Sequence, residues 1–248
     1  MRTESYEGCT KREFLLYGRK TIIVEPEHAL PGKPWVWRTE FFGAFPSADN
    51  ALLKMGFHLA YHSASDMYGC PEAVAMLEHF REWFCDTWKM SPRPVLFGFS
   101  RGGLYAVNYA LAHPKHTGAL YLDAPVLDFR SWPGKNPLYA REWQECLASY
   151  RMTEEEARAY RGTPLDRAGE LAALGIPTLI VAGEADTVVP CAENTDAFER
   201  AYRAAGGTAL STIRKPHCDH HPHSLADPAP ITAWILRALE IPAPDDKK

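Results

Sequence analysis

The sequence has no long apolar run, no excess of basic residues and no apolar N-terminal leader. A transmembrane helix needs about 18 or more consecutive apolar residues, and a signal peptide needs an apolar core, which residues 1–7 lack. The formal net charge is −4, whereas nucleic-acid-binding domains usually carry a basic face. We therefore expect neither a membrane nor a nucleic acid as a partner.

Cysteine is present but shows no pairing rhythm. The six cysteines are scattered between Cys9 and Cys218. In a chain without an export signal, such residues are typical of free thiols in a reducing compartment. This pattern predicts a cytoplasmic enzyme and leaves its oligomeric state open.

The chain also lacks internal repeats and a linker that would divide it. A length of 248 residues is compatible with one α/β domain. We expect a single domain over residues 1–248, with a small helical cap insertion at about 130–175. Residues 242–248 are polar and proline-rich, which predicts a frayed tail.

Apolar, β-branched segments alternate with segments of helical periodicity. This alternation predicts an α/β fold in which a mostly parallel central sheet is flanked by helices. The expected strands are 14–17, 21–24, 34–38, 57–61, 94–98, 119–122, 177–182 and 208–213. The expected helices are 48–56, 71–88, 105–113, 137–150, 154–160, 165–174 and 231–239. The first two strands form a hairpin around Gly18-Arg19, and the helical insertion follows the sixth strand.

One motif, G-x-S-x-G, lies between an expected buried strand and an expected helix, as Gly98-Phe99-Ser100-Arg101-Gly102. A nucleophilic serine on a cramped strand-to-helix turn needs small residues two positions before and two after it. The following helix directs its N-terminal amides at the site, where they favour developing negative charge. The motif in this context predicts that Ser100 is a nucleophile.

A serine nucleophile needs a base, and the base needs an acid that orients it. On this architecture the expected chain order is Ser, then Asp or Glu, then His. Asp186 follows the strand 177–182, at the edge of the sheet where sites form. We favour Asp186 because its loop is long enough to turn inward. Asp123 and Glu184 remain alternatives, and Asp186 could instead cap a helix that follows Pro190.

The expected position of the base is the loop after the last strand. That loop contains His217, His220, His221 and His223. Histidine and cysteine are also common zinc ligands, but no C-x-x-C or H-E-x-x-H partner motif occurs elsewhere. The sequence therefore predicts no metal and no cofactor. His217 and His223 could equally be exposed to solvent.

Together, Gly98–Gly103, the loop 183–186 and the segment His220-His221-Pro222 resemble an α/β-hydrolase over nearly the whole chain. The extended stretch 220–225, His-His-Pro-His-Ser-Leu, is similar to bacterial serine esterases of carbohydrate acyl groups. The resemblance implies the α/β-hydrolase fold, with Ser100 as nucleophile, Asp186 as orienting acid and His220 as base. Asp219 stands where glycine is usual, so His221 remains a competitor.

The resemblance also implies an oxyanion hole with two backbone donors. One donor is the amide of Arg101, the residue after the nucleophile. The other comes from the loop after the strand 34–38, where relatives often carry His-Gly. This chain has Thr39-Glu40-Phe41-Phe42-Gly43 there, and the Glu40 amide is the predicted second donor.

These residues predict a serine hydrolase that cleaves carboxylic esters through an acyl-enzyme. Polar and aromatic residues dominate the loops at the expected active edge: Glu40, Ser63, Ser65, Asp66, Tyr68, Arg101, Asp128, Arg130 and Trp132. Such loops favour a small ester with a short acyl chain, for example an acylated carbohydrate, whereas the alternative is that these residues only solvate the loop tips. We favour an esterase over a peptidase because the insertion is small and no propeller or large lid domain is present. A non-catalytic binding protein on the same fold remains the alternative from another class.

Overall fold

The computed structural model describes residues 1–242, which contain a nine-stranded sheet of order β1-β2-β3-β5-β4-β6-β7-β8-β9. The strands are β1 (Arg2–Tyr6), β2 (Cys9–Leu16), β3 (Arg19–Glu25), β4 (Trp35–Arg38), β5 (His58–His62), β6 (Val95–Phe99), β7 (Ala119–Asp123), β8 (Thr178–Gly183) and β9 (Leu210–Lys215). The pairs β1–β2, β2–β3 and β3–β5 are antiparallel, and all other pairs are parallel. The predicted mostly parallel sheet is confirmed.

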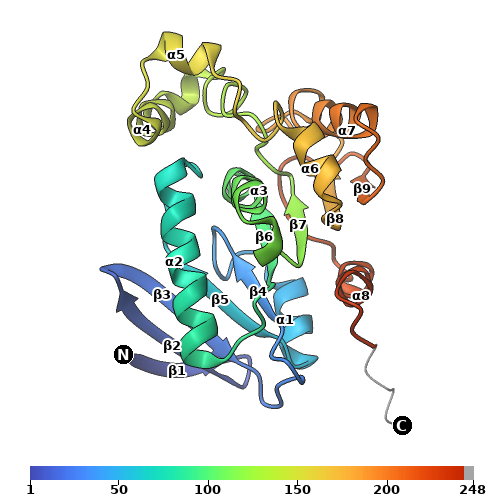
Figure 1. Cartoon of the computed structure of the whole chain (residues 1–248). Helices are drawn as coiled ribbons and strands as arrows, with labels where there is room; N and C mark the ends of the chain where they lie inside the picture. The colour runs from blue at the N-terminus through green and yellow to red at the C-terminus, as the bar shows by residue number, and fades with distance from the viewer. Residues whose placement is uncertain (243–248) are drawn as a thin grey trace.

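Helices cover both faces of this sheet (Figure 1). They are α1 (Ser47–Lys54), α2 (Pro71–Trp88), α3 (Gly102–Ala112), α4 (Ala140–Tyr150), α5 (Glu154–Ala159), α6 (Ala168–Leu174), α7 (Thr195–Ala204) and α8 (Ala229–Ala238), with short 3₁₀ helices at Pro114–His116, Pro137–Tyr139 and Cys191–Glu193. One buried cluster joins the sheet to α2, α3, α6 and α7, and another joins it to α1 and α8. Figure 1 shows α1 and α8 on the opposite side of the sheet from α2 and α3.

The apolar run of the central strand β6 is continuous because the strand is buried on both faces of the sheet. Successive side chains of a strand point to opposite faces of the sheet. Val95 and Phe97 accordingly pack toward α1 and α8, whereas Leu96 packs toward α2 and α3. A strand that is covered on both faces needs apolar residues at every position. This double burial holds the carboxyl end of β6, and therefore Ser100, on a rigid scaffold.

The N-terminal edge of the sheet differs from the prediction in two ways. Residues 2–6 form an additional edge strand, β1, so the helical insertion follows the seventh strand and not the sixth. The sequence does not reveal β1 because an exposed edge strand carries no apolar stripe. The hairpin turn is Tyr17-Gly18 and not Gly18-Arg19, because both residues adopt the positive φ of a type I′ turn, at 51° and 75°.

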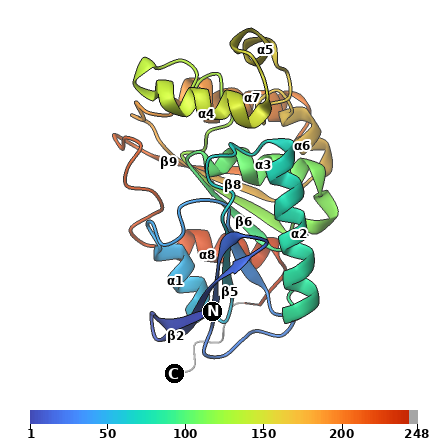
Figure 2. The same ribbon diagram turned by 90° about the vertical axis from the view of Figure 1, so that its left-hand side faces the viewer.

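The segment between β7 and β8 contains α4, α5 and α6 and lies above the carboxyl end of the sheet in Figure 2. Three hydrogen bonds tie α4 to the loop that precedes α2. Tyr68 donates to Glu145 at 3.1 Å, Ser149 donates to the carbonyl of Asp66 at 2.8 Å, and Tyr150 donates to the carbonyl of Tyr68 at 3.1 Å. The predicted frayed tail lies, apart from Pro242, outside the described residues.

The structure also bears on the expectations about membrane-spanning helices and about the cysteines. No helix within residues 1–242 is both long enough and apolar enough to cross a membrane. All six cysteines are free thiols, as their scattered positions predict.

Two buried histidines on β5 make the stability of the fold dependent on pH. His62 bonds to the Thr21 hydroxyl at 2.8 Å, and its ring stacks on Phe80 with the centroids 4.9 Å apart. His58 is only 4% exposed. Burial lowers the pKa of each imidazole to about 4. Both residues are therefore neutral in the folded protein near neutral pH.

The free energy of unfolding is expected to fall by about 2 kcal/mol for each of these histidines between pH 7 and pH 5. In that range the unfolded chain, in which histidine has a pKa of about 6.5, binds more protons than the folded chain. Urea unfolding at pH 7, 6 and 5 measures the change. His62→Asn, which keeps a polar atom near Nδ1, should flatten the pH dependence, whereas His28→Asn at a fully solvated site should not. An unchanged slope in His62→Asn would contradict the assignment.

Candidate active site

Ser100 lies on a tight turn between β6 and α3. Its φ is +49°, in the left-handed region that side chains other than glycine rarely adopt. A Cβ at Gly98 would lie 2.8 Å from Leu122 Cδ2, and one at Gly102 would lie 3.0 Å from Thr39 Oγ1. A side chain at either position would crowd these atoms, which favours glycine at each flanking position. The strand-to-helix context that the motif requires is present.

Asp186 lies in the loop after β8, and its carboxylate accepts three hydrogen bonds. Oδ1 accepts from the amides of Val188 and Val189 at 2.9 and 2.7 Å, and Oδ2 accepts from His220 Nδ1 at 2.8 Å. The alternative that Asp186 caps the helix after Pro190 is wrong, because that 3₁₀ helix, Cys191–Glu193, has Pro190 at its N-cap, and the backbone amides that donate to Asp186 are those of Val188 and Val189. The loop's own amides instead hold this carboxylate toward His220.

His220 lies in the loop between β9 and α8 and connects Asp186 with Ser100. Its Nε2 is 3.0 Å from Ser100 Oγ, and its side chain is almost completely buried. The preceding Asp219 accepts hydrogen bonds from the amides of Thr187 and His220, both at 2.8 Å. These bonds lower the pKa of the Asp219 carboxyl. Asp219 therefore ties the loop of Asp186 to the loop of His220, which glycine could not do.

The competing residues form a second pair. Asp123 accepts from His223 Nδ1, from the Ser224 amide and from the Tyr121 hydroxyl, each at 2.8 Å. His223 is buried and not exposed, and the position of Asp123 at the same sheet edge is the signal that could have indicated this contact. His221 is exposed and stacks on Phe45, with the ring centroids 5.5 Å apart. Within residues 1–242, His220 is the side chain that bonds to the Ser100 hydroxyl, and Asp123 reaches Ser100 only through its backbone carbonyl, which accepts from the Ser100 amide at 2.9 Å.

At this turn the backbone amides of Arg101 and Glu40 have no acceptor within the described part of the chain. The Glu40 nitrogen lies against the start of α3, since it is 3.7 Å from the position of a Cβ at Gly102. The Glu40 side chain is buried and accepts from Arg101 Nε at 2.9 Å and from the Ser65 hydroxyl at 2.8 Å. Burial raises the pKa of the Glu40 carboxyl, although the Arg101 guanidinium opposes this effect. The side-chain pair holds both backbones beside the turn.

A cavity of about 310 Å³ lies next to this ion pair. Its lining combines charged, hydroxyl and aromatic groups: Lys20, Ile22, Glu40, Phe41, Phe42, Tyr61, Ser65 and Arg101. The Arg101 guanidinium lies 5.3 Å from the Phe41 ring centroid and 3.4 Å from an oxygen of the exposed Asp66. The cavity therefore lies beside Arg101, the residue after Ser100, and its lining mixes polar and apolar groups.

Three other residues expected at this edge, Asp128, Arg130 and Trp132, stabilise the segment between β7 and β8. Arg130 donates to Asp128 at 2.7 Å, to Asp166 at 2.8 Å and to the carbonyl of Tyr160 at 2.6 Å. Trp132 is buried, with its ring 6.4 Å from that of Tyr68. These contacts hold the segment between β7 and β8 in place, and they correct the expectation that Asp128 and Arg130 face a ligand.

Solved structures of hydrolases share this fold. The dipeptidyl peptidase 4 of Porphyromonas gingivalis superposes with a TM-score of 0.67 at 14% identity, over 94% of this chain and 35% of that one. An S-formylglutathione hydrolase from Agrobacterium tumefaciens superposes with a TM-score of 0.63 at 14% identity, over 97% of this chain and 96% of that one. The chain thus spans about a third of the length of the dipeptidyl peptidase. These similarities confirm the α/β-hydrolase fold.

Sequence comparison assigns the family. No curated protein matches the chain. The family model described as the prolyl oligopeptidase family matches residues 58–240. This match covers well over half of the chain and includes the turn of Ser100 and the loops of Asp186 and His220. The chain therefore has the α/β-hydrolase fold and belongs to the prolyl oligopeptidase family.

Proposed function

We propose that Ser100 is the nucleophile, His220 the general base and Asp186 the acid that orients it. The observation that supports this assignment is the continuous chain of contacts from Ser100 Oγ to His220 Nε2 at 3.0 Å and from His220 Nδ1 to Asp186 Oδ2 at 2.8 Å. With the proton on Nδ1 donated to the carboxylate, Nε2 has a lone pair that accepts the serine proton. Ser100 Oγ then attacks an acyl carbon. His220 returns the proton to the leaving group, and water repeats the sequence to release the acid.

The amides of Arg101 and Glu40 are the proposed donors to the oxyanion of the tetrahedral intermediate. Their support is that both lie at the head of α3, beside the nucleophile, and donate to no acceptor within residues 1–242. Donors that are already oriented stabilise charge as it develops, and the loss of one such donor raises the barrier by about 3–4 kcal/mol. Glu40 therefore contributes through its backbone, while its carboxylate anchors Arg101.

We propose that residues at about 130–175 form a cap on the single domain and border the substrate entrance. The support is that α4 is bonded to the loop 66–68, whose Asp66 contacts Arg101 next to the nucleophile. Through these contacts the cap sets the position of one wall of the entrance.

For the substrate we propose a small carboxylic ester with a short acyl chain and a polar alcohol part. The mixed lining and small volume of the cavity beside Arg101 support this class, because pockets for long acyl chains are predominantly apolar. The hydroxyl-rich alcohol of an acylated carbohydrate is one member of the class. A peptide is the second candidate, and the match to the prolyl oligopeptidase family favours it.

A panel of substrates distinguishes these candidates. We expect kcat/KM to be highest for p-nitrophenyl esters of two or four carbons and to fall at least about tenfold for twelve carbons, because one methylene group changes selectivity by about 1–3 kcal/mol. Acetylated xylan fragments test the carbohydrate member, and a dipeptide p-nitroanilide tests the peptide candidate. A preference for chains of eight or more carbons would overturn the argument from the mixed lining of the cavity. Faster cleavage of the p-nitroanilide than of every ester would favour the peptidase.

A further inference from the structure

The mechanism proposed above gives no role to His223, a buried imidazole next to the proposed base. His223 donates from Nδ1 to Asp123 at 2.8 Å, and its side chain is 5% exposed. Within residues 1–242 its Nε2 has no hydrogen-bond partner. On this buried side chain, a ring nitrogen with a lone pair and an orientation that Asp123 fixes is an unused ligand next to the proposed base.

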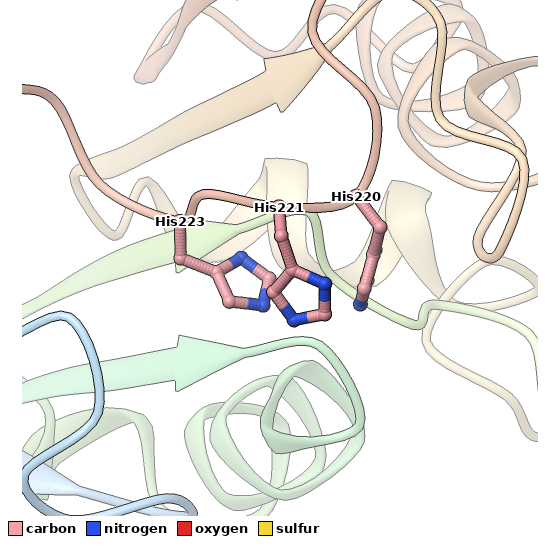
Figure 3. Close-up of side chains that lie close together, drawn as sticks. All are labelled: His220, His221 and His223. Atoms are coloured by element: carbon pink, nitrogen blue, oxygen red, sulfur yellow. The ribbon is translucent and has the colours of Figure 1, made fainter.

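His223 is one of three imidazoles that lie together on the loop after β9 (Figure 3). The ring centroids of His220, His221 and His223 are 4.8, 4.8 and 4.9 Å apart, and the rings are nearly perpendicular to one another. One ring nitrogen of each lies within 4.8 Å of those of the other two. The three side chains therefore form a compact group of nitrogen donors.

The environment of two of these rings is that of metal-binding histidines. A histidine that binds a metal usually donates its other ring N–H to a carboxylate, which sets the tautomer and the ring orientation. His220 has this arrangement with Asp186, and His223 has it with Asp123. In both rings Nδ1 carries the hydrogen bond to the carboxylate, so Nε2 is the nitrogen that can bind a metal ion, and in His220 the ion displaces the Ser100 hydroxyl that lies 3.0 Å from Nε2. The third ring, His221, is exposed and gives an ion access from solvent.

The loop that carries the three rings is held on both sides. Lys215 Nζ donates to the carbonyl of Pro222 at 2.6 Å, and the Ser224 amide donates to Asp123. A tetrahedral zinc ion has Zn–N distances of about 2.0–2.1 Å, which places its nitrogen ligands about 3.3 Å apart. The three ring nitrogens lie within 4.8 Å of one another. They reach the shorter spacing when the exposed His221 ring rotates and the other two rings shift slightly.

A second group of possible ligands, Glu78, His113 and His116, is much less suitable for a cation. Both oxygens of Glu78 already accept from Arg81, at 2.7 and 3.0 Å, and one also accepts from Tyr109. A guanidinium at this distance repels a metal ion and occupies the carboxylate. This group supplies a matched control for the three-histidine site.

We propose that His220, His221 and His223 bind a zinc ion and that this ion inhibits hydrolysis. The inhibitory effect rests on the proposed function, because it requires His220 to be the base. A zinc ion on Nε2 occupies the lone pair that would accept the serine proton. Magnesium, which prefers oxygen ligands and keeps its water shell, does not bind there.

The test measures binding and inhibition separately. Calorimetry of Ser100→Ala with ZnCl₂ should show one site. Co²⁺ in the same variant should give the visible absorption of a four-coordinate ion. Zn²⁺ should inhibit the wild-type hydrolysis of p-nitrophenyl acetate with a Ki equal to its Kd, reversibly on addition of EDTA, whereas MgCl₂ should not. The variant His221→Gln, at an exposed position, should raise both the Kd and the Ki for zinc at least about tenfold. Its inhibition is measured relative to its own hydrolysis rate without zinc.

Two control variants locate the site. His113→Gln together with His116→Gln tests the Glu78 group, and Cys218→Ser tests the thiol nearest in sequence. Both should leave the zinc Kd unchanged. The proposal is overturned if no zinc binds at about 1 mM, if binding depends on Cys218 or His113, or if His221→Gln leaves the Kd unchanged. The protein could also bind zinc through His221 and yet hydrolyse no ester or amide. That result supports the metal site and contradicts only the proposed function.

Discussion

Ser100→Ala is expected to lower kcat for ester hydrolysis by about 10⁴–10⁶-fold while leaving the free energy of unfolding nearly unchanged. The substitution removes only the hydroxyl oxygen that lies 3.0 Å from His220 Nε2. The turn keeps a small side chain at a position that is 9% exposed. Steady-state rates with p-nitrophenyl acetate and urea unfolding measure the two quantities.

A fluorophosphonate probe gives an independent reading of the same prediction. Such a probe reacts covalently with an activated serine and should label the wild-type protein once, and Ser100→Ala not at all. Ser211→Ala, at an exposed position on β9, is the matched control and should be labelled like the wild type. Turnover and labelling of Ser100→Ala at the wild-type level would exclude the serine mechanism.

Asp186→Asn is expected to lower kcat by about 10⁴-fold, because an amide cannot hold the imidazole in the tautomer that accepts the serine proton. Asp123→Asn should lower it by no more than about tenfold, since Asp123 is bonded to His223 and not to His220. The same rate assay and unfolding curves compare both variants. The opposite order of effects would assign the orienting acid to the end of β7.

Local patterns in the sequence carry much of the fold. Apolar residues at spacings of three and four predict a helix over 71–88, and α2 spans Pro71–Trp88. The nearby turn is also local, because the glycines of G-x-S-x-G are required by steric contacts at a strand-to-helix corner. The sequence does not predict β1, because the residues of an exposed edge strand bury nothing and leave no apolar period.

The pairing of acids with histidines is not a local property. Asp186 and Asp123 both follow buried strands, and His220, His221 and His223 lie within four positions of one another, so the sequence leaves several pairings open. In the structure Asp186 contacts His220 across 34 residues, and Asp123 contacts His223 across 100. Asp219 contributes to this choice through its bonds to the amides of Thr187 and His220.

The sequence by itself therefore determined which strands bring a serine, two carboxylates and a histidine loop to one edge of a parallel sheet. Burial patterns and the order of strands along the chain are sufficient for that. Only the tertiary structure decided which ring faces Ser100 and which faces Asp123. That choice depends on how two loops are hydrogen-bonded to each other, and such contacts between distant residues leave no period or spacing in the chain.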